Sequence, residues 1–561
     1  MVITSEEVYL IIECCPNIRR VIIVLESTDA ATPDPVIDVV HSSLYSPKPK
    51  WYHKSLSELC MDSIVDNMEK WTASRSLVHV STPFYLLPSH CLEYIIQCLN
   101  EGRRLKEEMF DLLINPHSKV LDLSKNAFVS TENDDDIETI NLRIVWLASV
   151  RCSQLTTLKF FGFNKLPSPT QVEETFTPIL QLFEHLQILD LSNTIYGASC
   201  MLYLGSTCKP KIRELLVDFC PGVTDLVMQV FCNGQSSLHK LSVLGTEVTH
   251  AGIRFAIEHL PVLKELTSST DILEVFFRIC KETRESKKCS LTKFSMRTMI
   301  STPLDIVRYK KGSVSLMVDM CPSLVDLFID VNDRGGGFTN EELLGFRELK
   351  LIKSLVIETY FMPTISIRGG VIPLLQVHGP TLEKLSLLSM KVTSEEFYLI
   401  IECCPNICRL RLAIENAYLE TPEPVLDCVS SFRYSKELIP LRMLEEIILS
   451  SDNFSSPFAI SRKLLLLLLF SPSLTLISIC NCITLDDQII EEACTRNSFK
   501  YLTSLRLYGC SNVSQKGIDF FMNETNPLSG ISVQKCGNVN LEHMKTMAQE
   551  KHWNQVNIYM W

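Results

Sequence analysis

Glycine and long apolar runs are both scarce in this sequence. Only 20 of the 561 residues are glycine, which excludes a collagen-like chain. The most apolar run, Leu464 to Phe470, is far shorter than the roughly 20 residues of a transmembrane helix, so we predict a buried helix there and no membrane partner. The N-terminus, Met1 to Glu7, lacks the basic start and apolar core of a signal peptide. We therefore expect a soluble protein of the cytosol or nucleus.

A basic surplus and paired cysteines are also missing. The formal net charge is −12, and basic pairs such as Lys310-Lys311 are isolated, so we predict no nucleic-acid partner. The 22 cysteines include no Cys-x-x-Cys pair at zinc spacing, and no signal peptide points to a disulfide scaffold. We interpret them as reduced thiols, and we predict no metal and no cofactor.

Catalytic motifs are absent as well. The sequence has no Gly-x-x-x-x-Gly-Lys-Ser/Thr loop, no Gly-x-Ser-x-Gly elbow and no His-Glu-x-x-His pair. Gly335 to Gly337 lack the lysine of a phosphate loop, and the acidic run Glu132 to Ile137 is typical of a solvated loop. These patterns predict a binding protein and not an enzyme.

The pattern L-x-x-L-x-L, with other aliphatic residues allowed, is present in about fifteen copies at intervals of roughly 25 to 37 residues. The alternating segment predicts a short strand with its leucines on one side. A single unit cannot bury those leucines, but stacked units share one core. The clearest copies are Leu186/Leu189/Leu191, Ile212/Leu215/Val217, Leu238/Leu241/Val243, Leu324/Leu327/Ile329, Leu382/Leu385/Leu387 and Leu502/Leu505/Leu507.

This pattern is typical of a leucine-rich repeat with a full helix in each unit. It predicts an α/β fold, a horseshoe-like solenoid with a parallel strand ladder and outer helices. Thr393 to Glu396 has the form of a capping box at a helix start. Leu260-Pro261, Cys321-Pro322 and Cys404-Pro405 are typical of unit ends, because proline cannot continue a helix.

Many cysteines recur at one place in the repeat. Leucine-rich repeats carry Asn or Cys three residues after the last strand leucine, where the side chain satisfies backbone groups of the turn. The sequence resembles the cysteine-containing subclass of the leucine-rich-repeat superfamily, which is common in ubiquitin-ligase receptors. The residues at this position are Asn126, Cys220, Cys482, Cys510 and Cys536.

Residues 1–46 are a near-copy of residues 390–435. Both contain Thr-Ser-Glu-Glu and Tyr-Leu-Ile-Ile-Glu-Cys-Cys-Pro-Asn-Ile. We expect the chain to begin inside a repeat, with a partial repeat over 1–46 that packs on a neighbour or is poorly ordered. The predicted division is this partial repeat, a helical box over 47–117, and a leucine-rich-repeat array over 118–561.

The leucine period stops over the predicted box. Leu56, Cys60 and Ile64 are spaced four apart, so they share one face of a predicted helix, and such a narrow stripe suits a partner's groove. Together with Ser55 they match an elongin-C-binding box, Ser/Thr-Leu-x-x-x-Cys-x-x-x-aliphatic.

A second motif follows and resembles a cullin box, apolar-Pro-x-x-apolar-x-x-x-apolar. Its residues are Leu87, Pro88, Cys91 and Ile95, and Pro88 suits a helix start. Box and repeats together resemble the Zyg-eleven/Zer family of elongin–cullin substrate receptors. That resemblance implies elongin C and a cullin as partners and a protein substrate as target. Family members continue into armadillo repeats that bind substrate, whereas this sequence ends at Trp561 in a leucine-rich repeat. The resemblance therefore does not predict how a substrate would bind.

Two other interpretations remain open for the same segment. Residues 87–99 also resemble the first helix of an F-box, which binds the Skp adaptor, although the later tryptophan of an F-box is absent. Alternatively, both apolar stripes bury against the first repeat and form a helical cap, in a scaffold without a ligase role.

The concave face is the predicted working surface, formed by the residues between the strand leucines. Exposed aromatic residues beside charges are common anchors of protein interfaces. The residues that we predict to contact a partner there are Lys240, Asp326, Phe328, Asp330, Lys384, Arg409, Arg411, Arg506 and Tyr508.

Overall fold

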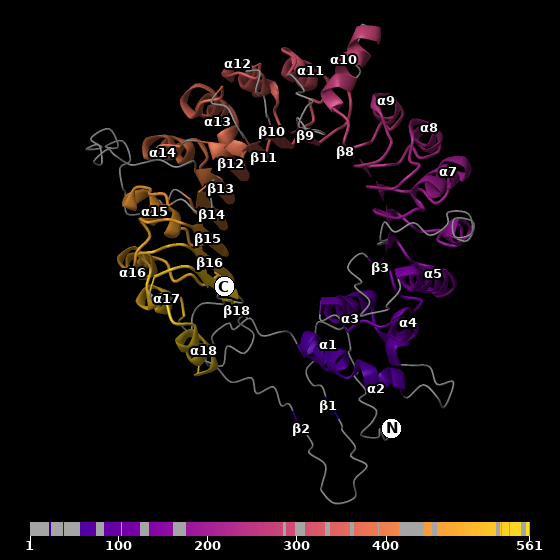
Figure 1. Cartoon of the computed structure of the whole chain (residues 1–561), viewed down its shortest axis with the longest axis horizontal. Helices are drawn as coiled ribbons and strands as arrows, with labels where there is room; N and C mark the ends of the chain where they lie inside the picture. Colours follow the sequence, from indigo (N-terminus) through magenta and orange to yellow (C-terminus); the bar gives the residue numbers. More distant parts are fainter. Residues whose placement is uncertain are drawn as a thin grey trace, which may run out of the picture. The chain divides into compact units, whose positions relative to one another are not determined.

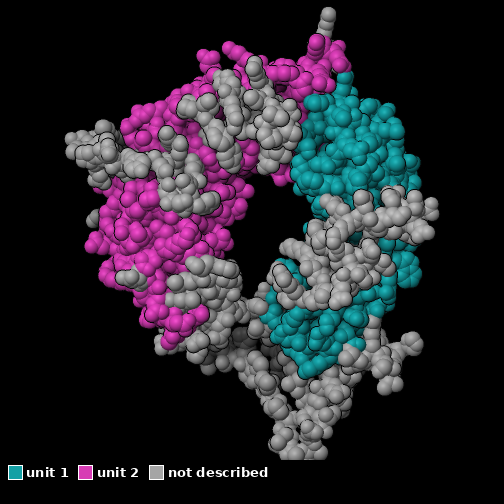
Figure 2. All heavy atoms as spheres, viewed as in Figure 1, with its two compact units in different colours: residues 1–48, 53–263, 267–270 teal, residues 49–52, 264–266, 271–561 magenta. Residues whose placement is uncertain are grey.

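The chain forms two compact units, which are coloured separately in Figure 2. Unit 1 contains residues 1–48, 53–263 and 267–270, and unit 2 contains residues 49–52, 264–266 and 271–561. The computed structural model describes residues 22–23, 37–38, 56–73, 83–101, 104–123, 134–160, 176–283, 288–297, 309–330, 337–358, 364–390, 392–414, 441–451, 457–522, 528, 530–537, 539–550 and 557–559.

The first repeats form a sheet of six strands in the described part of the chain, in which β3 to β7 pair in parallel, and helices lie between successive strands. Strand neighbours follow chain order without exception in this sheet, because each unit stacks on the one before it. The strands are β3 (Val120–Asp122), β4 (Thr157–Lys159), β5 (Ile188–Asp190), β6 (Glu214–Leu216), β7 (Lys240–Val243) and β8 (Glu265–Ser268). The helices are α5 (Asp134–Arg151), α7 (Gly197–Thr207), α8 (Asp225–Gly234) and α9 (His250–His259).

Unit 2 carries a longer ladder, in which ten described strands pair in parallel and in chain order. In Figure 1 these strands line one side of the unit and the helices line the other. The strands are β9 (Lys293–Arg297), β10 (Asp326–Asp330), β11 (Ser354–Glu358), β12 (Lys384–Met390), β13 (Arg409–Ile414), β14 (Glu446–Ser451), β15 (Leu476–Cys480), β16 (Ser504–Tyr508), β17 (Gly530–Gln534) and β18 (Asn557–Tyr559). The helices are α10 (Ile272–Thr283), α11 (Ser313–Met320), α12 (Asn340–Leu344), α13 (Ile372–His378), α14 (Ser394–Cys403), α15 (Arg462–Leu469), α16 (Asp487–Arg496), α17 (Gln515–Phe521) and α18 (Leu541–Glu550).

The core is a continuous stack of aliphatic side chains from adjacent strands. On β12, Leu385 and Leu387 are buried at 1% and 0% exposure, while Lys384 before them and Ser386 between them face outward. Leu385 is in register with Leu355 of β11 and with Leu410 of β13. This pairing joins the repeats into one interior, so the predicted α/β leucine-rich-repeat solenoid is confirmed.

The predicted ends of individual repeats are also confirmed. Leu260, Cys321 and Cys404 are the C-terminal caps of α9, α11 and α14, and a proline follows each. The leucines of the apolar run, 464–469, lie in α15 and are all buried. No helix of the described residues has the length and apolarity to cross a bilayer.

Hydrogen bonds connect the N-terminal ends of neighbouring helices, and we call this series of contacts the polar ladder. Asp487, the first residue of α16, accepts hydrogen bonds from the backbone N–H and the hydroxyl of Ser514, which caps α17, at 2.8 and 2.5 Å. Asp225 at the start of α8 does the same for Thr249 before α9, at 2.8 and 2.5 Å. Each carboxylate therefore satisfies a donor of the next repeat, where helix starts leave N–H groups without intrahelical partners.

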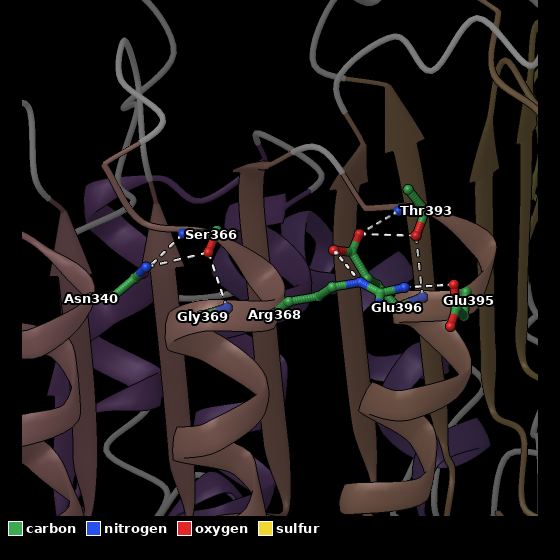
Figure 3. Close-up of polar contacts among 7 residues, drawn as sticks. All are labelled: Asn340, Ser366, Arg368, Gly369, Thr393, Glu395 and Glu396. Atoms are coloured by element: carbon green, nitrogen blue, oxygen red, sulfur yellow. Dashed lines mark hydrogen bonds and ion pairs between the residues drawn. The ribbon is translucent and has the colours of Figure 1, made fainter.

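Figure 3 shows two variants of this ladder in unit 2. Asn340 of α12 accepts the Ser366 N–H at 3.0 Å, and the Ser366 hydroxyl accepts the Gly369 N–H at 3.0 Å. At α14 the predicted capping box is present, because Thr393 and Glu396 bond each other's backbone N–H groups. The Arg368 guanidinium reaches from the preceding helix toward Glu396, at 3.7 Å.

The N-terminal copy is described at two places. Ile22–Ile23 (β1) and Ile37–Asp38 (β2) pair antiparallel. The rest of residues 1–46, and with it the predicted partial repeat, lies outside the described residues. The predicted division at residues 46 and 117 stays a prediction.

Candidate protein-interaction surfaces

The predicted box is a cluster of short helices that precedes β3, the first strand of the repeat array. It consists of α1 (Leu56–Asp66), α2 (Met68–Ala73), a 3₁₀ turn η2 (Pro83–Leu86), α3 (Ser89–Glu101) and α4 (Glu107–Leu113). Helix α1 packs on α3 and α2, whereas α3 packs on β3, and α4 packs on α5. Among the described elements, α1 and α2 are therefore the outer helices of the box, and α3 and α4 join it to the repeats.

The apolar face of α1 is wider than the predicted stripe. Met61 and Val65 are buried at 4% and 5% exposure, and Cys60 and Ile64 are buried beside them at 6% and 8%. Positions 60 and 65 lie about 140° apart around a helix. Cys60 therefore lies at one edge of the buried face, with Met61 and Val65 nearer its centre and far edge. Ser55 and the side chain of Leu56 lie outside the described residues.

The second motif lies deeper in the box. Pro88 immediately precedes α3, and its carbonyl accepts the N–H groups of Cys91 and Leu92, so it marks the helix start as predicted. Cys91 and Ile95 are buried at 0% exposure, and Leu87 at 7%. The structure thus brings the two motifs onto packed helices, with the residues of α3 in the interior.

Polar contacts hold α1 against α3 at the rim of the apolar face. The Tyr94 hydroxyl on α3 donates to Asp62 Oδ1 on α1 at 3.1 Å. Burial, together with hydrogen bonds to Cys98 and Asp62, raises the pKa of Tyr94, so the phenol remains a proton donor. Arg104 also forms an exposed ion pair with Asp66 at 3.2 Å, which contributes little to stability.

A buried asparagine that sequence reasoning missed docks the box on the first repeat. The Asn115 side chain, 0% exposed, donates to the Phe84 carbonyl at 2.7 Å and accepts the His117 N–H at 2.8 Å. The backbone carbonyl of Asn115 accepts a hydrogen bond from the Cys152 thiol at 3.1 Å. A buried amide with this many partners fixes its surroundings, because unmade hydrogen bonds are costly there. The only sequence signal is a polar residue that follows a run of three apolar ones.

The residues predicted on the concave face all lie on strands with side chains exposed or half-exposed, as the alternation requires. Lys240 lies on β7 of unit 1, in register with Glu214. The other eight lie on β10, β12, β13 and β16 of unit 2, namely Asp326, Phe328, Asp330, Lys384, Arg409, Arg411, Arg506 and Tyr508. Their role in partner binding stays a prediction.

The strand register groups four of these residues as the strand-face cations, Lys384, Arg409, Arg411 and Arg506, which are all exposed. Lys384 is in register with Arg409, whose guanidinium pairs with Glu446 on β14 at 3.2 Å. The row of Arg411 continues through Ile448 and Ser478 to Arg506.

The repeat cysteines have a structural role, as predicted. The Cys220 thiol donates to the Leu191 carbonyl of the preceding repeat at 3.0 Å, and Cys510 donates to the Ile479 carbonyl at 3.6 Å. Burial raises the pKa of Cys220 and of Cys482 to about 11, so these thiols are poor nucleophiles. Asn126 lies outside the described residues. Within the described ranges, no three His, Cys, Asp or Glu side chains converge where a metal ion could bind.

Comparison with protein-family models and with curated proteins gives no match. Among solved structures, the chain is similar to the Rad7 and Elc1 complex in yeast at 14% identity and a TM-score of 0.42, covering 83% of this chain and 96% of that one. An internalin (inlF) from Listeria monocytogenes is 9% identical with a TM-score of 0.32, and covers 67% and 81%. LegL7, a leucine-rich-repeat-containing protein from Legionella pneumophila, is 12% identical with a TM-score of 0.30, and covers 55% and 87%.

The parallel ladder itself decides the fold. The chain has a leucine-rich-repeat fold. Such repeat arrays present a continuous strand face that typically serves as a binding scaffold.

Proposed function

We propose that this leucine-rich-repeat protein is a substrate-recognition subunit of a cullin-type ubiquitin ligase. Helix α1 of the box binds an elongin C adaptor, a cullin joins through the same box, and the strand faces bind a target protein. The proposal combines the box motif at Ser55, Leu56, Cys60 and Ile64 with a repeat array built for protein contacts.

The position of α1 at the outside of the box is the main support for elongin C binding by this helix. Its motif residues Cys60 and Ile64 lie toward one edge of its buried face with 6% and 8% exposure, so a partner helix would bind there by displacing contacts within the chain while Met61 and Val65 keep α1 packed on α3. Position 56 continues the same edge one helical turn earlier, at the first residue of α1.

The burial of α3 disfavours the F-box-type interpretation. Cys91 and Ile95 are 0% exposed between α1 and the first repeat, so a Skp adaptor could reach them only after the box opens. We propose that these residues of the cullin-box-like motif act by holding α1 in place. Their contribution to ligase assembly is then a positioning one.

A helical cap without a ligase role is the second candidate. It is favoured by the buried Asn115 and by the near-complete burial of Cys60 and Ile64, which already satisfy the apolar face within the chain. Under this candidate the box only shields the edge of the first repeat from water.

Co-purification of the full chain with elongin C and, separately, with the Skp adaptor tests the proposal. Elongin C is expected to remain bound to the intact chain and to be lost from the variant carrying Leu56→Ala and Cys60→Ala. The matched control carries Met61→Ala and Val65→Ala, which removes more buried side-chain volume from the centre and far edge of the same helix face. The control is expected to lower the melting temperature and to retain elongin C.

The outcomes separate the candidates. Capture of neither adaptor by the intact chain ends the ligase proposal and leaves the cap. Capture of the Skp adaptor alone supports the F-box-type alternative. Equal loss of elongin C from both double variants would show that only the folding of α1 matters, and the edge contact would be rejected.

A further inference from the structure

A cationic surface stands out on a chain whose formal net charge is −12. Lys384, Arg409 and Arg411 lie on the adjacent strands β12 and β13, and Arg506 lies three strands further along the same face. Neighbouring strands are about 4.8 Å apart, so the row from Arg411 to Arg506 spans about 14 Å across β13 to β16.

Little of this charge is neutralised by the chain itself. Arg409 pairs with Glu446 at 3.2 Å. In the described part of the chain, no ion pair joins Lys384, Arg411 or Arg506 to a carboxylate. Three exposed cations on a rigid sheet therefore offer their donors to groups from outside the chain.

Apolar side chains fill the space between the cations. Ile448 and Leu476 are half-exposed on β14 and β15, the two strands between Arg411 and Arg506. Half-exposed aliphatic groups on a strand face gain from burial under a partner's side chain. The row thus has cations at both ends and Ile448 and Ser478 in the middle, and Leu476 lies beside it, two residues before Ser478 and in register with Glu446.

We propose that the strand face of β12 to β16 binds an extended acidic segment of a partner protein. Its carboxylates pair with Lys384 and Arg411 at one end and with Arg506 at the other. An aliphatic side chain of the segment packs on Ile448 and Leu476 between them. This inference rests on the proposed function, since it names the class of target that the receptor recognises.

A nucleic acid fits this face less well than a peptide. Nucleic-acid interfaces neutralise several phosphates, about 6 to 10 in strongly salt-dependent complexes, whereas this face offers four cations, one of them paired with Glu446. The aliphatic centre also matches a leucine side chain, and the ring of Tyr508 on β16, on which a base could stack, already has the Lys535 ammonium 5.2 Å from its centroid.

Fluorescence anisotropy on the full chain tests the proposal with a labelled peptide, Gly-Asp-Glu-Asp-Leu-Ser-Leu-Asp-Glu-Asp-Gly. Three comparison probes are the same peptide with lysine at every acidic position, the same peptide with serine at both leucines, and a labelled oligothymidylate. The acidic peptide is expected to bind at least tenfold more tightly than its lysine counterpart and about fivefold more tightly than its serine counterpart. Its affinity should fall severalfold between 50 and 300 mM salt, because these charges are exposed.

Charge-reversal variants localise the site. Lys384→Glu with Arg411→Glu is expected to weaken binding of the acidic peptide at least tenfold. The matched control is Lys463→Glu with Lys500→Glu, which reverses two exposed cations of unit 2 that lie off the strands, and it should change the affinity less than twofold. Circular dichroism and melting temperature confirm that both variants fold.

Several results would overturn the inference. These are equal binding of the acidic and lysine peptides, tighter binding of the oligothymidylate, or equal weakening in both charge-reversal variants. The assay contains no adaptor, so its failure leaves elongin C capture untouched. Conversely, loss of elongin C capture with intact peptide binding would reject the ligase role alone.

Discussion

Replacing Gly517 by alanine should destabilise the protein, which is opposite to the usual effect of this change in a helix. Gly517 is the third residue of α17, where alanine would normally favour the helix by about 0.5–1 kcal/mol. Here a Cβ atom would lie 2.4 Å from Asp487 Oδ1, which accepts the Ser514 N–H at 2.8 Å. The carboxylate has to move, and losing one charge-assisted hydrogen bond costs about 1.5–3 kcal/mol. The net loss should be about 1–2 kcal/mol in the local free energy of unfolding.

Hydrogen exchange of the amides of α16 and α17 measures this quantity locally, which suits a repeat array that does not unfold as a single two-state unit. In the Asp487→Ala background the carboxylate clash and the hydrogen bond are both gone, and the remaining close atom, Ile490 Cδ1 at 3.1 Å, is the end of a flexible side chain. Gly517→Ala should then stabilise α17 by about 0.5–1 kcal/mol. Gly530→Ala is a control, because nothing lies within 4 Å of its Cβ position. A higher opening free energy for Gly517→Ala in the unchanged background would refute the reasoning.

Two further predictions concern buried titratable groups. Burial lowers the pKa of His378, whose Nε2 lies 3.0 Å from the Phe346 carbonyl. The folded chain therefore keeps it neutral while the unfolded chain takes up a proton below about pH 6.5, so stability is full above that pH and falls below it. The melting temperature should drop less between pH 7.5 and 5.5 in His378→Gln, and an unchanged slope would contradict this assignment. Iodoacetamide at pH 8 should modify the exposed Cys208 rapidly. It should modify Cys220 only after the protein unfolds, because that thiol is buried and its pKa is raised to about 11. Peptide mapping distinguishes the two sites.

The strand ladder was predictable because one strong signal determines it. Leu385 and Leu387 alternate with polar residues, and burial of the leucines dominates the energy of a short strand, so their side of the sheet follows from sequence. The helix over Leu56 to Asp66 follows from the same reasoning at the helical period. The burial of Cys60 was not predictable, since a partner-binding motif specifies one edge of a helix and says nothing of the neighbouring residues that pack within the chain.

The polar ladder between helix starts was missed for a different reason. Asp487 and Ser514 are 27 residues apart, and each looks like an ordinary residue of a helix start by itself. Only the glycine that follows Ser514 by three positions marks the pair, because the acid needs the space of a missing Cβ. A search for Asp or Asn at one helix start and Ser/Thr-x-x-Gly at the next would find it, as Asp225 with Thr249 and Gly252 shows.

This ladder restricts how repeats can be exchanged during evolution or engineering. A repeat whose helix begins with Asp487 fits only a successor with a small capping residue and a glycine, and a successor that begins like Thr393 brings Glu396 to the same place instead. Transplanting one repeat alone would therefore set two carboxylates against each other or leave a helix start without its acceptor. The transferable module of this protein is a pair of adjacent repeats, and shuffled arrays should preserve their junctions more strictly than their strands.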